Sequence, residues 1–216
     1  TDPDGDNVSY SGAANLATTV EVSPNAHPWL AGRPDGSSVV GGTALADSPV
    51  LAATNEFFAA GDALSVVVTG NAGTDSSDVY GPRGYNGTTF YGPRDGFSGL
   101  RAPWAAPIGV FLTDDAPDPA STPPDLNFAA AGIGADFLTL SPELQQPFLI
   151  GNGRTTDGTV QEFVVPVGAT RLFVGIMDSS TWSTNPGDGF ELTLVSQRDA
   201  GIVVDSTSGV VTWTPS

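Results

Sequence analysis

The sequence predicts an all-β protein built from many short strands joined by tight turns. Its 216 residues include 27 Gly and 18 Pro, whereas only 14% are charged, a composition typical of chains that turn often. No window holds a convincing helical period, and the best helical candidate is short, residues 141–146, with a Ser cap followed by Pro. A chain of this length can bury a substantial core as one large β domain or as two small ones.

Strands are expected wherever β-branched and aromatic residues run between turns that contain Gly or Pro. Residues 71–107 exceed the usual length of a connection, and their dense aromatic side chains indicate an ordered loop packed on the body of the protein. Before residue 170, the expected strands are residues 18–22, 49–53, 62–70, 108–113, 148–151 and 161–165.

The two strongest strands, residues 170–177 and 189–195, flank a loop that is rich in oxygen atoms. Each strand alternates so that one face is strongly apolar, and we expect the two to form a β-hairpin with a rigidly held tip. In this loop Asp178, Asn185 and Asp188 could bind a cation. Asp178 could instead cap the loop by accepting hydrogen bonds from nearby backbone N–H groups.

Charge narrows the range of partners. The net charge is −17, the pI is about 4.1, and all seven basic residues are Arg. Such a surface repels phosphate backbones and anionic lipids, so we expect no nucleic acid partner and no membrane insertion. No apolar run approaches the roughly 20 residues of a membrane span. Divalent cations are natural partners, although most carboxylates could serve only solubility or adaptation to high salt.

The two ends of the chain carry strand motifs of a different kind. Residues 1–11 read TDPDGDNVSYS, and residues 202–215 read IVVDSTSGVVTWTP, two strands around a Ser/Gly turn. Both resemble consecutive strand motifs of cadherin-like and bacterial Ig-like modules of cell-surface proteins. Because the motifs are here far apart, the resemblance implies a β-sandwich domain framed by parts of an Ig-like module. The start at Thr1 rather than Met leads us to expect a piece of a longer protein.

A second cation site is a further possibility near the amino end. Asp2, Asp4 and Asp6 alternate in a loop that contains Gly, and this spacing allows side-chain oxygens to converge on a hard cation. The remaining ligands of an EF-hand loop are missing, so a solvated turn is an equally good interpretation.

The middle of the chain, residues 18–196, resembles the PA-I-type galactophilic bacterial lectins, which are calcium-dependent β-sandwich proteins. The matching stretches occur in order: PVLAAT, AAGDALSVVVTG, DVYGPRG, FYGPRDG, IGVFL, FVVPVGATRLFVGIMD and NPGDGFELTLV. The resemblance implies a β-sandwich of the jelly-roll or galactose-binding type, with partial Ig-like strands from the two termini. The implied domains are an N-terminal Ig- or cadherin-like strand segment (1–16), a lectin-like β-sandwich (17–196) and a C-terminal Ig-like strand pair (197–216).

The resemblance also implies a calcium site. In that family a Tyr carbonyl, an Asp carboxylate, a second carbonyl and two Asn side chains hold the ion, and sugar hydroxyls complete its coordination. Pro186 stands where the second Asn belongs and offers no side-chain oxygen, so the site must be weakened or rebuilt. The implied ligands of Ca²⁺ are the Tyr80 carbonyl, the Asp178 carboxylate, the Trp182 carbonyl and the Asn185 amide, with Asp188 as the replacement.

The sugar contacts implied by the resemblance overlap with these ligands. The family's His and Gln contacts have no counterpart, since the single His, His27, lies far away in sequence. Trp182 or Tyr91 could stack on the apolar face of a hexose, although Trp182 could equally cover the rim of the sandwich. The carbohydrate-binding residues are therefore expected to be Tyr80, Tyr91, Asp178, Ser179, Trp182 and Asn185.

The sequence does not predict an enzyme. His27 accompanies no nucleophile-elbow motif, the glutamates form no recognisable acid/base pair, and phosphate-binding loops and zinc-ligand clusters are absent from the sequence. We expect a calcium-dependent, lectin-like module of a bacterial secreted or cell-surface protein that binds galactose-type glycans outside the cell. The alternative is a structural module of an adhesin or filament, stiffened by calcium, whose terminal strands pair with neighbouring domains or subunits.

Overall fold

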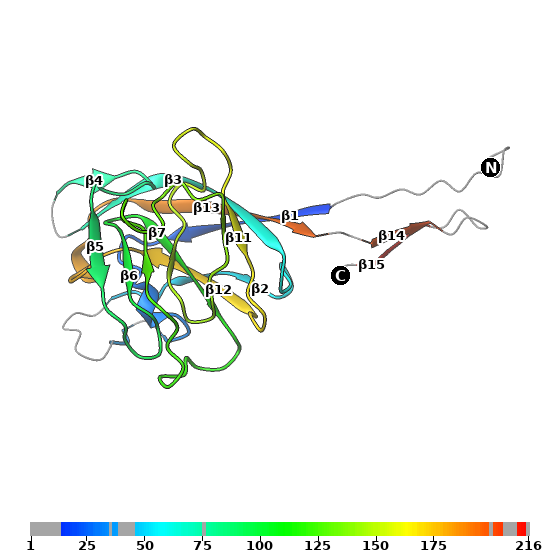
Figure 1. Ribbon diagram of the computed structural model, residues 1–216, viewed down its shortest axis with the longest axis horizontal. Coiled ribbons are helices and arrows are strands. Elements are labelled where there is room, and N and C mark those ends of the chain that lie inside the picture. Colours follow the sequence, from blue (N-terminus) through cyan, green and yellow to red (C-terminus); the bar gives the residue numbers. More distant parts are fainter. Residues whose placement is uncertain are drawn as a thin grey trace.

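The computed structural model describes residues 14–34, 36–38, 46–74, 77–198, 201–204 and 211–214 (Figure 1). Within these ranges the chain is mostly β and forms no α-helix, which confirms the expected all-β character. Two single turns of 3-10 helix occur, η1 (Pro28–Leu30) and η2 (Trp182–Thr184). The helical candidate at 141–146 is wrong: it forms a turn in which Gln145 has a φ of 62°.

The largest sheet of the described residues has six strands. Its order is β1-β13-β3-β11-β9, and the short β4 pairs with the far end of β3. All pairs are antiparallel except β11 with β9. The strands are β1 (Ala14–Val22), β3 (Ala63–Gly73), β4 (Val79–Tyr80), β9 (Thr139–Leu140), β11 (Glu162–Val164) and β13 (Gly189–Arg198).

Three smaller sheets complete the fold. A four-stranded antiparallel sheet has the order β10-β7-β12-β2, a three-stranded sheet has the order β5-β6-β8, and β14 pairs with β15. Their strands are β2 (Val50–Thr54), β5 (Thr88–Tyr91), β6 (Leu100–Pro103), β7 (Pro107–Leu112), β8 (Leu126–Asn127), β10 (Phe148–Leu149), β12 (Arg171–Ile176), β14 (Gly201–Val204) and β15 (Val211–Thr214).

Apolar side chains of the six- and four-stranded sheets meet in one core. The rings of Phe148 from β10 and Phe163 from β11 lie 5.4 Å apart, and Phe111 of β7 stacks on Phe148. Leu64 of β3 and Leu172 of β12 line the same small enclosed space between the sheets. Burial of these side chains is the main favourable contribution to folding, and it fixes one sheet against the other.

The expected hairpin between residues 170–177 and 189–195 is wrong. Both segments are strands, but β12 pairs with β2 and β7, whereas β13 pairs with β1 and β3. The connection between them, residues 177–188, therefore crosses from one sheet to the other. Alternation of apolar residues tells which face of a strand is buried but not which strand lies beside it. Five of the six residues of β12 are buried, so both faces of this strand are covered. A strand of the expected hairpin would have exposed one face to solvent.

The expectation of a long loop over residues 71–107 is also wrong, because this range contains β4 (Val79–Tyr80), β5 (Thr88–Tyr91) and β6 (Leu100–Pro103). Its aromatic residues do pack, as expected: Phe97 is fully buried, and Tyr91 and Trp29 have ring centroids 4.5 Å apart. The six other expected strands coincide with β1, β2, β3, β7, β10 and β11 to within a few residues.

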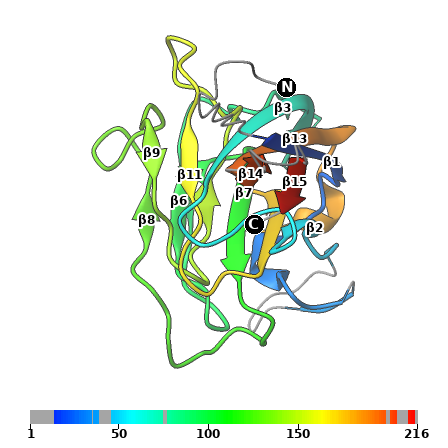
Figure 2. The same ribbon diagram turned by 90° about the vertical axis from the view of Figure 1, so that its right-hand side faces the viewer.

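The expected domain boundaries fall inside strands. β1 and β13 pair continuously from Ala14 with Arg198 to Val22 with Phe190, and so extend across positions 16/17 and 196/197. The two strands expected in residues 202–215 are present as β14 and β15 (Figure 1). Figure 2 views the molecule from the end at which this hairpin lies. The Asp2, Asp4 and Asp6 motif lies outside the described residues. In the described ranges no helix is long and apolar enough to cross a membrane.

Candidate functional site

The loop that follows β12 lies against Gly73, the last residue of β3. The backbone N–H of Gly73 donates to the carbonyl of Pro186 over 2.8 Å. A Cβ on Gly73 would lie 2.2 Å from the carbonyl oxygen of Asp78 and 2.7 Å from Cγ of Pro186, so only Gly fits there. This close approach brings the β12–β13 loop next to Tyr80, which pairs with Ala72 in the β3–β4 ladder.

A pocket of about 340 Å³ opens where these segments meet. Tyr80 and Asp178, which the sequence predicts to share a site, both line it. Its volume lies near the lower end of the range for small-molecule sites, about 300–1,000 Å³. The complete lining is Thr74, Asp78, Tyr80, Tyr85, Trp104, Asp178, Ser179 and Ser180.

Three aromatic rings form one wall of this pocket. Tyr80 and Tyr85 meet edge to face with centroids 5.4 Å apart, and Tyr85 and Trp104 lie 5.8 Å apart. The indole N–H of Trp104 points to the hydroxyl of Ser179 at 3.5 Å. The pKa of Tyr80 lies above its usual value because of desolvation, and next because of the carboxylate of Asp78. The wall therefore combines apolar ring surface with acceptors for hydroxyl groups.

Asp178 is buried at the floor of the loop, with 2% of its surface exposed. Its Oδ1 accepts hydrogen bonds from the backbone N–H groups of Ser179 at 2.5 Å and Ser180 at 3.3 Å. This is the loop-capping role that the sequence left open. Because a carboxylate has two oxygens, capping through Oδ1 is compatible with binding a cation.

Asn185 lies on the other side of η2 from Asp178 and is also buried, with 6% exposure. Its Nδ2 donates to the carbonyl of Pro24 at 3.0 Å, and its backbone N–H donates to Oδ1 of Asn25 at 3.2 Å. The side-chain Oδ1 of Asn185 is buried and accepts no hydrogen bond from the residues that the structure describes. A buried acceptor without a donor costs about 1–3 kcal/mol, so this oxygen can accept a further ligand.

Trp182 and Tyr91 occupy the core rather than a ligand-facing wall. They are 2% and 7% exposed, and the Trp182 ring stacks on His27 with a centroid separation of 3.6 Å. The Trp182 indole N–H donates to the carbonyl of Ile176 at 2.7 Å. Packing on both rings leaves no face for a hexose, so burial contradicts the expected stacking role and also the rim position considered for Trp182. The Trp182 carbonyl accepts one N–H, from Asn185, and has a second lone pair.

His27 is part of the same aromatic cluster. Burial lowers the pKa of His27 to about 3, and the positive charge of Arg94 contributes. Its Nδ1 accepts a hydrogen bond from the backbone N–H of Trp29, as a neutral imidazole can. Tyr91 meets His27 edge to face at 5.4 Å. His27 therefore packs as a neutral aromatic ring at neutral pH.

Of the remaining residues expected at the site, some line the pocket and others do not. Ser179 lines the pocket, whereas Trp182, Asn185 and Asp188 lie outside its lining. Asp188 is exposed, and its backbone N–H donates to Oδ1 of Asn71 at 3.3 Å. Asp78, Tyr85 and Trp104 also line the pocket, and sequence reasoning assigned them no role. Tyr85 and Trp104 belong to the aromatic-rich stretch that follows Tyr80-Gly81-Pro82. The abundance of aromatic residues in that stretch does not tell which rings are buried and which line a pocket.

The chemistry open to this site follows from its donor set. The described residues include no cluster of three or more His, Asp or Glu side chains arranged to hold a metal. Any cation here would be held by a mixture of carboxylate, amide and carbonyl oxygens, the hard ligands that suit Ca²⁺. Comparisons of the chain with family models, curated proteins and solved structures find no match. The function must therefore be inferred from the site itself.

Proposed function

We propose that this chain is a calcium-dependent carbohydrate-binding module, similar to the PA-I-type galactophilic lectins, from a bacterial secreted or cell-surface protein. In this proposal the two facing sheets form a β-sandwich of the jelly-roll or galactose-binding type. The observation that carries the proposal is the shared pocket of Tyr80 and Asp178, two residues that are distant in sequence.

The proposed cation ligands are the carbonyls of Tyr80 and Trp182 and the side chains of Asp178 and Asn185. Support comes from the buried Oδ1 of Asn185, which accepts no hydrogen bond within the described ranges, and from the buried carboxylate of Asp178. Ca²⁺ binds about 6–8 oxygen atoms, so four protein ligands leave positions for two sugar hydroxyls or waters. The exposed Asp188 is not needed as a replacement for the Asn that Pro186 displaces.

The proposed sugar lies in the pocket beside this cation. Hydroxyl groups can donate to the carboxylate of Asp78 and exchange hydrogen bonds with Ser179 and Ser180, which line the same pocket. The rings of Tyr85 and Trp104 take the stacking role that sequence reasoning gave to Trp182 or Tyr91. A galactose-type hexose is the ligand class that the resemblance favours.

The test is calorimetric titration with methyl β-galactoside in calcium and in excess EDTA. Binding is expected in calcium and absent with EDTA. Asp178→Asn is expected to abolish it, and the matched control Glu191→Gln, which removes an exposed carboxylate on β13, is expected to bind like the wild type. Calcium-independent binding, or no binding of any hexose in a glycan array with calcium, would contradict the proposal.

A second candidate is a structural module that assembles through its terminal strands without binding sugar. The observation in its favour is that β14 and β15 pair only with each other among the described strands. An isolated two-stranded hairpin is marginally stable in water and exposes two strand edges that another chain can extend. Light scattering across protein concentration tests it: association that Val203→Pro abolishes would favour assembly, and a monomer at every concentration would count against it.

A further inference from the structure

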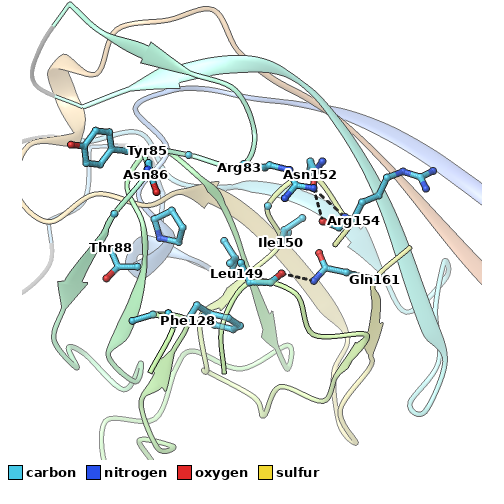
Figure 3. Close-up of a pocket in the computed structure, with 17 residues that line it drawn as sticks. Arg83, Tyr85, Asn86, Thr88, Phe128, Leu149, Ile150, Asn152, Arg154 and Gln161 are labelled. Atoms are coloured by element: carbon cyan, nitrogen blue, oxygen red, sulfur yellow. Dashed lines mark hydrogen bonds between the residues drawn. The ribbon is translucent and has the colours of Figure 1, made fainter. Parts of the chain in front are cut away.

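A second pocket, drawn in Figure 3, has Tyr85 in its lining, as the first pocket does. Its volume is about 550 Å³. Its lining includes Arg83 and Asn86 from one segment and Leu149, Ile150 and Asn152 from another. Figure 3 shows the Arg83 side chain beside Asn152. The Tyr85 side chain is therefore a boundary that the two pockets share.

The second pocket differs from the first in charge. None of the described residues that line it is acidic, although the chain holds 24 Asp and Glu, and two of its seven Arg residues contribute to the lining. By contrast, Asp78 and Asp178 line the first pocket. In a chain with a net charge of −17, this is a place where an anionic group can approach with little repulsion.

Arg83 supplies the positive charge at a fixed position. Its Nη2 donates to the carbonyls of Thr155 at 2.6 Å and Arg154 at 3.4 Å, which holds the guanidinium against the wall of the pocket. The guanidinium of Arg154 points away from the pocket in Figure 3, and its Nη1 donates to the carbonyl of Gly158. Arg83 is therefore the cation that a ligand in this pocket would meet.

One carboxylate interacts with Arg83 from outside the pocket lining. The pKa of Asp136 lies below its usual value, chiefly because Thr156 donates to it and to a smaller extent because of Arg83. The backbone N–H and the hydroxyl of Thr156 hold this carboxylate at 2.6–2.7 Å. Asp136 weakens the field of Arg83 without occupying the pocket, and the planar guanidinium can still recognise a carboxylate.

We propose that the second pocket binds the carboxylate-bearing residue of an acidic glycan, a sugar acid linked to the galactose-type residue held in the first pocket, with Arg83 as the determinant of specificity. This inference rests on the proposed function, because it places the two units of one glycan on either side of Tyr85, which lines both pockets. Asn86 and Asn152 supply amide groups for the hydroxyls of the second residue.

The test compares two open-chain galactosides that differ in a single group. Lactobionate carries a carboxylate on its second unit, and lactitol carries a neutral alcohol at that position. Calorimetry in calcium is expected to show lactobionate binding about three- to tenfold more tightly than lactitol, and the preference is expected to shrink when NaCl rises from about 0.05 M to about 0.5 M.

Three variants assign that preference to Arg83. Arg83→Gln is expected to bind lactitol normally and lose the preference for lactobionate, and Arg83→Lys is expected to keep part of it. Arg101→Gln, which removes an Arg that contacts Phe90 outside both pockets, is expected to keep all of it. Normal lactitol binding by Arg83→Gln shows that the first pocket remains folded.

The outcomes separate this inference from the proposed function. Equal affinities of the wild type for lactobionate and lactitol would overturn the acidic-glycan inference and leave the galactose site standing. A preference that survives in Arg83→Gln would also overturn it. If neither galactoside binds in calcium, both the inference and the proposed function fail.

Discussion

The imidazole ring of His27 stacks on the indole ring of Trp182 with centroids 3.6 Å apart and planes inclined by 9°. This stack joins the segment before η1 to η2, the short helix between Asp178 and Asn185. Two loops from opposite ends of the chain are thereby fixed against each other beside the candidate site. The neutral state of the imidazole is part of that packing, because burial penalises the charged form.

Stability should depend on pH through His27. Its pKa is about 3 in the folded protein, below the usual 6.5, so the unfolded chain binds more protons in the interval between them. The contribution to stability is complete above about pH 6.5 and is lost as pH falls toward 3. Urea unfolding at pH 6.5 and 5.5 should show that the wild type loses about 1 kcal/mol more than His27→Gln. Parallel pH profiles for the two proteins would contradict this expectation.

Calcium should stabilise the folded protein. An ion that binds only the folded state at about 100 times its Kd adds about 2.7 kcal/mol, which for a chain of this size raises Tm by about 5–10 °C. Thermal unfolding followed by circular dichroism should show this shift in calcium, and EDTA should reverse it. Asp178→Asn should abolish the shift, whereas Asp188→Asn should retain it because Asp188 is exposed outside the pocket. Loss of the shift in Asp188→Asn would show that the site is rebuilt around Asp188.

The two indole rings near the site should respond differently to truncation. Trp104 lines the pocket, whereas Trp182 is 2% exposed in the core. Trp182→Ala should therefore destabilise the protein by about 3–5 kcal/mol in urea unfolding. Trp104→Ala should change stability less and weaken galactoside binding about tenfold through the loss of stacking. Unchanged galactoside affinity in Trp104→Ala would remove Trp104 from the sugar site.

Glycine at position 73 should be required for the pocket to form. Gly73→Ala places a Cβ 2.2 Å from the carbonyl oxygen of Asp78, so the loop must shift, at a cost of about 1–3 kcal/mol. The matched control is Gly81→Ala, because a Cβ at Gly81 meets nothing within 4 Å. Urea unfolding should show the control within about 0.5 kcal/mol of the wild type. Similar stabilities for both variants would contradict the close packing of the β12–β13 loop on Gly73.

Much of the fold could be predicted from residue patterns, and the pairing of strands could not. The runs that form β3, β7 and β12 are rich in β-branched residues and end at turns, which are local signals. The partner of β13 is set instead by contacts with β1 and β3, which lie far away in sequence. No local pattern encodes those contacts, and so the expected hairpin with β12 failed.

At the candidate site, too, some features could be predicted from the sequence and others depend on contacts between distant segments. Tyr80 and Asp178 were expected to share a site, and both line one pocket. The stacking roles expected for Tyr91 and Trp182 are incompatible with burial, and burial depends on the approach of His27 and Trp29 from the amino-terminal part of the described chain. Sequence composition shows that aromatic residues are abundant but not which of them water can reach.

The crossing of residues 177–188 from the four-stranded to the six-stranded sheet bears on the order of folding events. Neither sheet can assemble the pocket by itself, since Asp178 follows β12 and Tyr80 belongs to β4 beside β3. A partly folded chain with only one sheet in place would have no affinity for a ligand. Occupancy of this pocket would therefore report that both halves of the molecule have docked, and a bound ligand would slow their separation.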